Sequence, residues 1–155
     1  LNSLTLNNLR RIGGSLNILG TNLMSLTLNN LIEIVEDFGA YYMEKLQSLT
    51  LKSLKKIGGR FTVIRNPKLE NLTLNKLENI GRNFSIYENT HLKTVNFEDL
   101  NDDSIEGEKL IILIFPQNPT PARFTSISSV ISGIQDYYEK SDYDKFVIPP
   151  PDDGD

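Results

Sequence analysis

The chain has 155 residues, of which 39% are hydrophobic and 23% are charged, and it carries a formal net charge of −4. This length suits one domain of ordinary globular composition, and the absence of cysteine excludes disulfides, cysteine-ligated zinc and thiol catalysis. The negative charge gives no general attraction to nucleic acid, and no apolar run reaches the roughly 20 residues that span a bilayer.

An internal repeat runs through the first 115 residues. The pattern L-x-x-L-x-L-x-x-L begins at residues 1, 23, 46 and 69, and a degenerate fifth copy begins at residue 92, so the period is 22 or 23 residues. A second pattern, I-G-G-x-[LF]-x-[IV], completes the repeat at residues 12–18 and 57–63. A unit this short cannot bury its leucines alone, and stacked neighbours are needed to cover them. The repeat therefore predicts a solenoid.

Two short strands are expected in each repeat, because residues 4–6 and 16–18 alternate apolar and polar side chains. The Gly-Gly pairs at 13–14 and 58–59 lie between these strands, where a tight turn with positive φ suits glycine. Parallel stacking predicts three inward columns: Leu4/Leu26/Leu49/Leu72/Val95, Leu6/Leu28/Leu51/Leu74/Phe97 and Leu16/Phe38/Phe61/Phe84. The predicted fold is mainly β, a short right-handed parallel β-solenoid of about five coils.

A different pattern follows the repeats. Residues 110–115 are apolar at every position, which predicts a strand covered on both faces. Prolines then predict a loop. Apolar residues recur after it at helical spacing: Ile127, Val130, Ile131, Ile134 and Tyr138. Ser126 or Thr125 is the expected N-cap of this helix, which we expect to cap the C-terminal end of the solenoid together with Phe146 and Ile148.

Three segments are expected from these patterns. The repeat solenoid covers residues 1–115, a loop and helical cap cover 116–148, and a Pro-rich acidic tail covers 149–155. Leu1 is already in register with the repeat, so we expect the chain to begin inside a longer protein or after a processing cut. The first coil is then expected to be uncapped.

The combined motif, L-x-x-L-x-L-x-x-L-x-x-I-G followed by F-x-I or F-x-V, resembles the receptor L-domain family. Residues 46–64 and 69–89 carry the resemblance, and residues 1–18 follow it closely. The family contains the leucine-rich-repeat-like β-solenoid modules of insulin- and epidermal-growth-factor-type receptors and of sporulation-specific fungal cell-wall glycoproteins. The resemblance implies an extracellular or cell-surface recognition role and no reaction. Because the animal receptor domains carry cysteines, a cysteine-free chain resembles the microbial or fungal relatives more.

Few residues in the chain carry chemistry, and none forms a recognised catalytic pattern. His91 is the only histidine and is expected to be a solvated turn residue. The acidic pairs at 36–37 and 102–103 are expected at the surface or in turns. The segment 101–108 offers oxygen ligands for Ca²⁺, but in no EF-hand spacing, and the glycine pairs match no phosphate-binding loop. The sequence therefore predicts a protein that is not an enzyme, with no cofactor and no metal.

A polar ladder is the most unusual predicted surface. Threonines recur at one outward strand position, and serines or asparagine recur two residues earlier. The predicted partner-binding face consists of Ser3, Thr5, Ser25, Thr27, Ser48, Thr50, Asn71 and Thr73. Its expected ligand is a protein or a glycan. Two alternatives stay open: threonine simply suits an exposed strand, or the regular hydroxyls form an ice-binding array.

Two further groups are secondary candidates for the binding site. Tyr41, Tyr42 and Tyr87 follow the second strand, and exposed tyrosines favour interfaces and sugars. Residues 1–100 carry 12 basic and 9 acidic residues, a net charge of +3. The basic residues gather in the third repeat as Lys52, Lys55, Lys56, Arg60, Arg65 and Lys68. They favour an anionic partner, or else form a solvated face that keeps strand edges from aggregating.

The sequence thus predicts a non-enzymatic recognition module that binds a protein or glycan partner at a cell surface or wall. The alternative is a structural subunit of a filament, sheath or wall assembly, which would associate head to tail through its uncapped N-terminal end.

Overall fold

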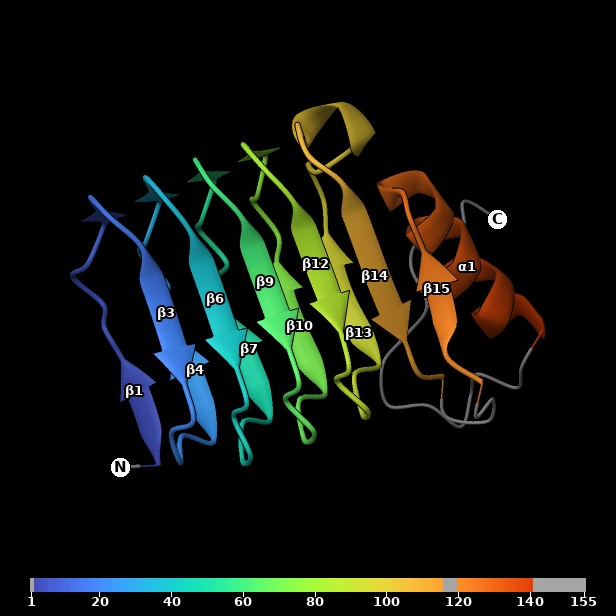
Figure 1. The fold of residues 1–155 in the computed structure, drawn as a ribbon, viewed down its shortest axis with the longest axis horizontal. Helices are drawn as coiled ribbons and strands as arrows, with labels where there is room; N and C mark the ends of the chain where they lie inside the picture. The colour runs from blue at the N-terminus through green and yellow to red at the C-terminus, as the bar shows by residue number, and fades with distance from the viewer. Residues whose placement is uncertain (1, 116–119, 141–155) are drawn as a thin grey trace.

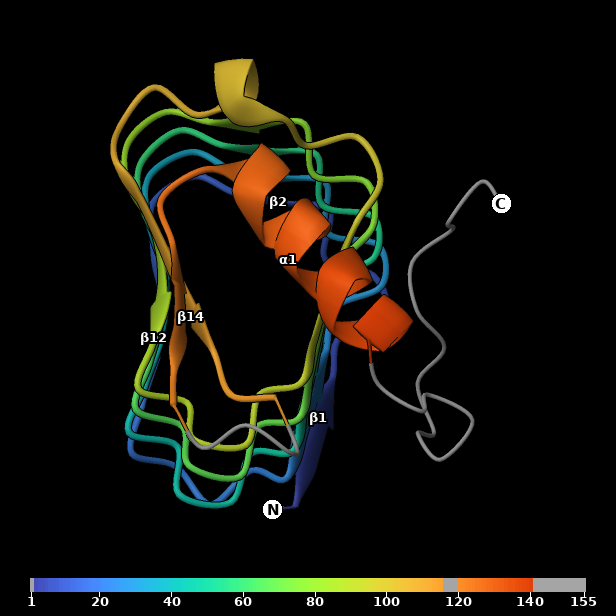
Figure 2. The same cartoon turned by 90° about the vertical axis from the view of Figure 1, so that its right-hand side faces the viewer.

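A computed structural model describes residues 2–115 and 120–140 of the chain. The repeats form a parallel β-solenoid of about five coils, and an antiparallel strand and a helix follow at its C-terminal end (Figure 1). The predicted mainly β solenoid is confirmed. Viewed along the stack, the first and last strands of each coil form two long walls, and a short strand lies between them (Figure 2).

The first strand of each coil belongs to one parallel sheet, which we call sheet A. Its order is β1-β4-β7-β10-β13. The bounds are β1 Ser3–Thr5, β4 Ser25–Thr27, β7 Ser48–Thr50, β10 Asn71–Leu74 and β13 Thr94–Phe97. The register pairs Leu26 with Leu49 and Leu49 with Leu72, and all three are buried. The predicted leucine column is therefore confirmed.

The last strand of each coil belongs to a second sheet, sheet C. Its order is β15-β14-β12-β9-β6-β3. The bounds are β3 Leu16–Leu19, β6 Phe38–Tyr41, β9 Phe61–Ile64, β12 Phe84–Tyr87, β14 Lys109–Leu113 and β15 Ala122–Phe124. The buried rings of Phe38, Phe61 and Phe84 stack in consecutive coils, with centroids 5.1 and 5.2 Å apart. The predicted phenylalanine column is also confirmed.

Each of the first four coils contains a third strand that the sequence pattern did not predict. These two-residue strands form sheet B, with bounds β2 Arg11–Ile12, β5 Glu33–Ile34, β8 Lys56–Ile57 and β11 Asn79–Ile80. Ile34, Ile57 and Ile80 are buried in one column. A two-residue strand is too short to show alternation, so periodicity alone could not find it.

The expectation that the Gly-Gly pairs need positive φ is wrong. Among the glycines of the described residues, only Gly20 has positive φ. The glycines inside the stack instead allow close approach. A Cβ on Gly58 would lie 2.1 Å from the carbonyl oxygen of Val35 in the preceding coil, and one on Gly81 would lie 2.1 Å from the carbonyl oxygen of Gly58. Glycine is therefore required there by coil-to-coil contact.

Two buried asparagines, which the sequence analysis did not single out, join coils in the turn after sheet C. Asn66 Oδ1 accepts a hydrogen bond from Met43 N at 3.0 Å, and Asn89 Oδ1 accepts one from Asn66 N at 3.0 Å. Their amide groups donate to the carbonyl oxygens of Ala40 and Val63. These side chains satisfy backbone groups of neighbouring coils that water cannot reach. The only sequence signal is their spacing of one repeat, 23 residues.

The C-terminal segment differs from the prediction in two details. Ile111 and Leu113 of β14 are buried, whereas Leu110 and Ile112 are half-buried, so the strand is covered fully on one face only. Helix α1 spans Ile127–Lys140. It buries Ile127, Val130 and Ile134 in the core, but Ile131 is exposed. Residues beyond 140 lie outside the described residues, and so do the predicted roles of Phe146, Ile148 and the Tyr138 side chain.

Aromatic stacking and a serine cap fix this helix. The ring of Tyr137 stacks on Phe115, with centroids 4.3 Å apart, so the packed face of the helix includes Tyr137 and leaves out Ile131. Ser126 Oγ accepts a hydrogen bond from Ser129 N at 3.1 Å. This geometry confirms Ser126 as the N-cap.

The close coil contact at Gly58 leads to a testable difference between two glycines. Gly58→Ala should lower the free energy of unfolding by at least about 2 kcal/mol, because its Cβ meets the Val35 carbonyl, part of the backbone. Gly13→Ala should change that free energy by less than about 0.5 kcal/mol, because the nearest atom to its Cβ is Arg11 Nη1 at 4.0 Å. Urea denaturation followed by circular dichroism measures both. Equal losses in the two variants would contradict the steric explanation.

Candidate functional site

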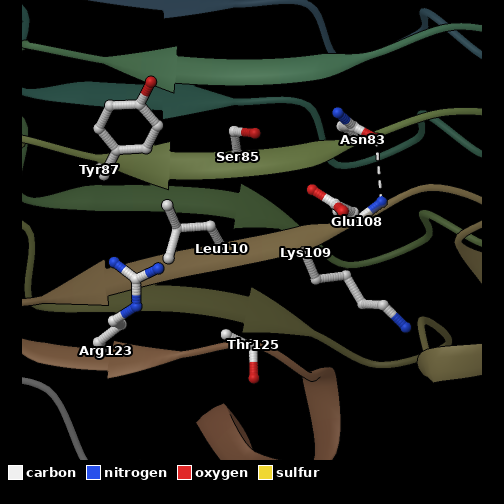
Figure 3. A pocket seen from close by; sticks show the side chains of 8 residues that line it. All are labelled: Asn83, Ser85, Tyr87, Glu108, Lys109, Leu110, Arg123 and Thr125. Atoms are coloured by element: carbon white, nitrogen blue, oxygen red, sulfur yellow. Dashed lines mark hydrogen bonds between the residues drawn. The ribbon is translucent and has the colours of Figure 1, made fainter.

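A hollow of about 530 Å³ lies on the outer face of sheet C at its C-terminal end. We call it the β12–β15 hollow. Its lining comes from strands β12, β14 and β15, from the residues just before β12 and β14, and from Thr125 just after β15 (Figure 3). Because Phe84 and Ile86 point into the core, the alternate residues Ser85 and Tyr87 point outward into the hollow. Its volume lies in the usual range for small-ligand sites.

The register of the three strands places the lining side chains. Leu110 pairs with Ser85, and Arg123 on β15 pairs with Ile112 two residues further along β14. In Figure 3, Leu110 lies between Tyr87 and Arg123, and the guanidinium of Arg123 is directed toward Leu110. Asn83 and Glu108 lie at the opposite end of the hollow. Leu110 and Ser85 thus lie between the end that carries Tyr87 and Arg123 and the end that carries Asn83 and Glu108.

The charged groups of the hollow differ in their partners. Lys109 Nζ lies 3.2 Å from the carbonyl oxygen of Asp102 and 3.5 Å from its carboxylate, so its charge is already compensated. Asn83 Oδ1 accepts a hydrogen bond from Glu108 N at 2.9 Å. Within the part of the chain that the structure describes, the Glu108 carboxylate and the Arg123 guanidinium have no hydrogen bond and no ion pair. Both are free to bind a ligand.

An apolar stripe runs from the hollow across the outer face of sheet C. It consists of Leu19, Tyr41, Ile64 and Tyr87, which the register aligns in consecutive coils. Leu19 is 63% exposed, and the other three are half-buried. The ring of Tyr41 lies over Gly39, where a Cβ would be 2.3 Å from Tyr41 Cε2. Tyr41 and Tyr87, which we expected after the second strand, are its last residues and occupy equivalent positions two coils apart, with Ile64 between them.

The third tyrosine candidate, Tyr42, lies in the turn after sheet C and belongs to a fixed cluster. Tyr42, Arg65 and Glu88 occupy equivalent positions with positive φ, between 55° and 58°. Arg65 donates hydrogen bonds to the Tyr42 hydroxyl at 2.8 Å and to the Glu88 carboxylate at 2.6 Å. The hydrogen bond and the charge of Glu88 raise the pKa of Arg65, which stays protonated. These groups bind one another and so offer little to a ligand.

The predicted hydroxyl face is assembled as expected. The register of sheet A aligns Ser3, Ser25, Ser48 and Asn71 in one column and Thr5, Thr27, Thr50 and Thr73 in the next. Ser3 and Thr5 are exposed, and the other six are half-buried. These eight residues, which we call the hydroxyl face, lie on sheet A and not on the sheet that carries the hollow.

The basic residues of the third repeat do not form one face. Lys52 follows sheet A, Lys55 and Lys56 lie at sheet B, Arg60 precedes β9, and Lys68 lies in the turn before β10. Because each coil runs once around the circumference of the solenoid, basic residues of the same coil lie on different sides of it. Arg60 also lies 4.0 Å from an Asp37 carboxylate oxygen, and Arg65 is paired with Glu88. The structure therefore brings no basic patch together from this set.

The histidine and acidic residues considered as catalytic or metal-binding candidates contact other parts of the fold. His91 is exposed, and its Nδ1 lies 2.7 Å from the carbonyl oxygen of Pro67. In residues 2–115 and 120–140, no group of three histidine or acidic side chains could hold a metal ion. Asp102, one of the acidic candidates, begins the 3-10 helix η1 (Asp102–Ser104). Its carboxylate reaches α1.

Asp102 caps the N-terminus of α1 from a distant part of the chain. Its carboxylate accepts hydrogen bonds from Ile127 N at 2.6 Å and from the Ser128 hydroxyl at 3.0 Å. Partial burial acts to raise its pKa, but these hydrogen bonds, the bond from Ser128 N and the charge of Lys109 together hold the pKa of Asp102 below its ordinary value. The ionised form is therefore the one that the folded state prefers.

The lowered pKa of Asp102 predicts a pH-dependent stability. Its contribution is present above the unfolded pKa of about 3.9 and is lost as the pH falls through the lower folded value. Asp102→Asn should therefore lower the free energy of unfolding by about 1 kcal/mol at pH 7, and the gap to the wild type should close toward pH 2. Denaturation curves across this pH range test it. Asp103→Asn is the matched control and should stay within about 0.5 kcal/mol at every pH.

Searches against protein-family models, curated proteins and solved structures found no match for this chain. The described residues also contain no helix with the length and apolar character needed to cross a membrane. The site must therefore be interpreted from its own residues. Sequence reasoning found Tyr87 but did not place Asn83, Ser85, Glu108 or Arg123 in a binding site. Arg123 was missed because β15 lies in a segment that the prolines had assigned to a loop. The other three carry no ligand-binding motif, and only the end of the repeat makes their positions differ from those of other coils.

Proposed function

We propose that this chain is a non-enzymatic recognition module that binds a protein or glycan partner on the outer face of sheet C. The observation that carries this proposal is the apolar stripe and the hollow at its end. Binding energy at interfaces concentrates in buried aromatic anchors, and tyrosine is enriched among them, whereas serine and threonine are under-represented. Tyr41 and Tyr87 are therefore better anchors than the hydroxyl face of sheet A.

The rigidity of the stack supports this function. Tyr41 and Tyr87 stand on strands paired on both sides by neighbouring coils. The same strands begin at the buried, stacked rings of Phe38 and Phe84, and the Asn89 amide donates a hydrogen bond to the Tyr87 carbonyl oxygen at 3.1 Å. A surface fixed in this way loses little conformational entropy when a ligand binds.

We further propose a secreted or cell-wall location and membership of the receptor L-domain family. The repeat motif at residues 46–64 and 69–89 supports both. The three-walled coil with parallel strands is compatible with this assignment. The hydroxyl face remains the alternative binding face.

Two double variants separate the candidate faces. Tyr41→Ala with Tyr87→Ala should weaken binding by about 30-fold or more, because both anchors are removed. Thr27→Ala with Thr50→Ala, the matched truncation on sheet A, should leave affinity within about twofold and lower the free energy of unfolding by less than about 1 kcal/mol. Glycan arrays and displayed peptide libraries supply the strongest ligand, and biolayer interferometry measures its affinity for each variant.

The opposite pattern would move the site to the hydroxyl face: binding lost in the threonine variant and kept in the tyrosine variant. A wild-type chain that binds no glycan and no peptide would contradict the recognition function.

Assembly into a larger structure is the second candidate function, and the N-terminal end of the stack favours it. Here an apolar hollow of about 460 Å³ is lined by leucines that include Leu4, Leu6 and Leu9. Leu6 is 40% exposed, although its equivalents Leu28 and Leu51 are buried. The C-terminal end is covered by β15 and α1 (Figure 2), so the predicted head-to-tail contact has no open partner. A second copy would instead meet this one N-terminal end to N-terminal end.

Self-association through this end is measurable. The wild-type chain should form dimers with rising concentration in analytical ultracentrifugation, and Leu6→Lys should remain monomeric because its charge would be buried in the contact. Ile131→Lys, a matched change on exposed α1, should dimerise as the wild type does. A wild-type monomer at all concentrations would contradict the assembly function.

A further inference from the structure

The β12–β15 hollow combines three kinds of chemical group within one site. Tyr87 and Leu110 supply an apolar surface. Ser85 and Thr125 supply hydroxyls on either side of Leu110, since Ser85 lies on β12 and Thr125 follows β15 (Figure 3). Arg123 and Glu108 supply an unpaired cation and an unpaired anion. A ligand that uses the whole site therefore needs an apolar face and a polar rim.

The two free charges are too far apart to compensate each other. Arg123 pairs with Ile112, which is four residues beyond Glu108 along β14. At about 3.3 Å per residue, roughly 13 Å separates the two positions along the strand. A ligand long enough to contact both groups meets a positive charge at one end and a negative charge at the other. An oligomer that carries one sign of charge along its length is attracted at one end and repelled at the other, so the pair favours a spanning ligand without net charge.

The polar rim offers donors and acceptors together. The Arg123 guanidinium donates only, the Glu108 carboxylate accepts only, and the hydroxyls of Ser85 and Thr125 do both. The Asn83 amide nitrogen is a further donor, because only the oxygen of this side chain is used by Glu108 N. A sugar hydroxyl both donates and accepts, so a ring of hydroxyls satisfies this mixed set, and its C–H face can pack on Tyr87.

We infer that the β12–β15 hollow binds a neutral glycan, whose sugar ring packs on Tyr87 and Leu110 and whose hydroxyls bridge Glu108 and Arg123. This inference rests on the proposed recognition function and names its ligand class. It differs from peptide binding, which would use the backbone edge of β15 and would depend less on both charges.

Titration calorimetry with short neutral oligosaccharides from mannan, β-glucan and chitin tests the inference, and oligogalacturonate serves as the acidic probe. At least one neutral probe should bind the wild-type chain, with little dependence on salt. Arg123→Ala and Glu108→Gln should each weaken it by about tenfold, because each removes a charged hydrogen-bonding group. Arg10→Ala and Glu78→Gln make the same changes at exposed positions away from the hollow and should leave affinity unchanged.

Glu108→Gln also distinguishes neutral from acidic ligands, because it should weaken the binding of a neutral glycan and strengthen the binding of an anionic one. If oligogalacturonate alone binds, and Glu108→Gln strengthens it, the site takes an anion and the inference is overturned. If only displayed peptides bind, and Tyr41→Ala with Tyr87→Ala abolishes that binding, the recognition function stands and the glycan inference fails. If no probe of either class binds, both fail. Circular dichroism of each variant confirms that it is folded.

Discussion

In-register stacking of parallel coils is the constraint on which the rest of this structure depends. A coil on its own leaves its backbone hydrogen-bonding groups unpaired and its apolar side chains exposed to water. The neighbouring coils supply the hydrogen-bond partners and bury these side chains. The leucine and phenylalanine columns follow from this contact. So do the glycines, because the backbone of one coil approaches Gly58 and Gly81 of the next too closely for a Cβ. The buried amides of Asn66 and Asn89 complete the contact where the chain turns.

The same constraint gives the two outer walls different chemistry. Inward positions must be apolar in every coil, whereas outward positions are free to differ between the sheets. Sheet A presents mostly small hydroxyl-bearing side chains, whereas one of the two outward columns of sheet C consists of larger apolar and aromatic ones. The hollow forms where the repeat ends, because β15 runs antiparallel to β14 and brings Arg123 beside residues of the regular coils.

The two ends of the stack are also unlike. At the C-terminal end, Asp102 links the last coil to α1 through the backbone amides of Ile127 and Ser128, and α1 packs its apolar residues on the core. In the first described coil, Leu6 is 40% exposed, whereas its equivalents Leu28 and Leu51 are buried by neighbouring coils. The sealed end is the one that lies beside the candidate ligand site.

By itself, the sequence determined the period of the repeat, the inward columns, the sheet A register and a helix cap at Ser126 or Thr125, of which the structure shows Ser126. Each depends on residues close in sequence or one period apart. Tertiary structure alone decided the short strands of sheet B, the role of the glycines and the pairing of β15. It also showed that the basic residues of one repeat point to different sides, and that Glu108 and Arg123 belong to one hollow. The sheet B strands and the close contact of Gly58 with Gly81 keep the repeat spacing, but two-residue strands and backbone contacts leave no periodic signal. The β15 pairing and the hollow join residues with no shared spacing, because they arise where the chain ends the stack.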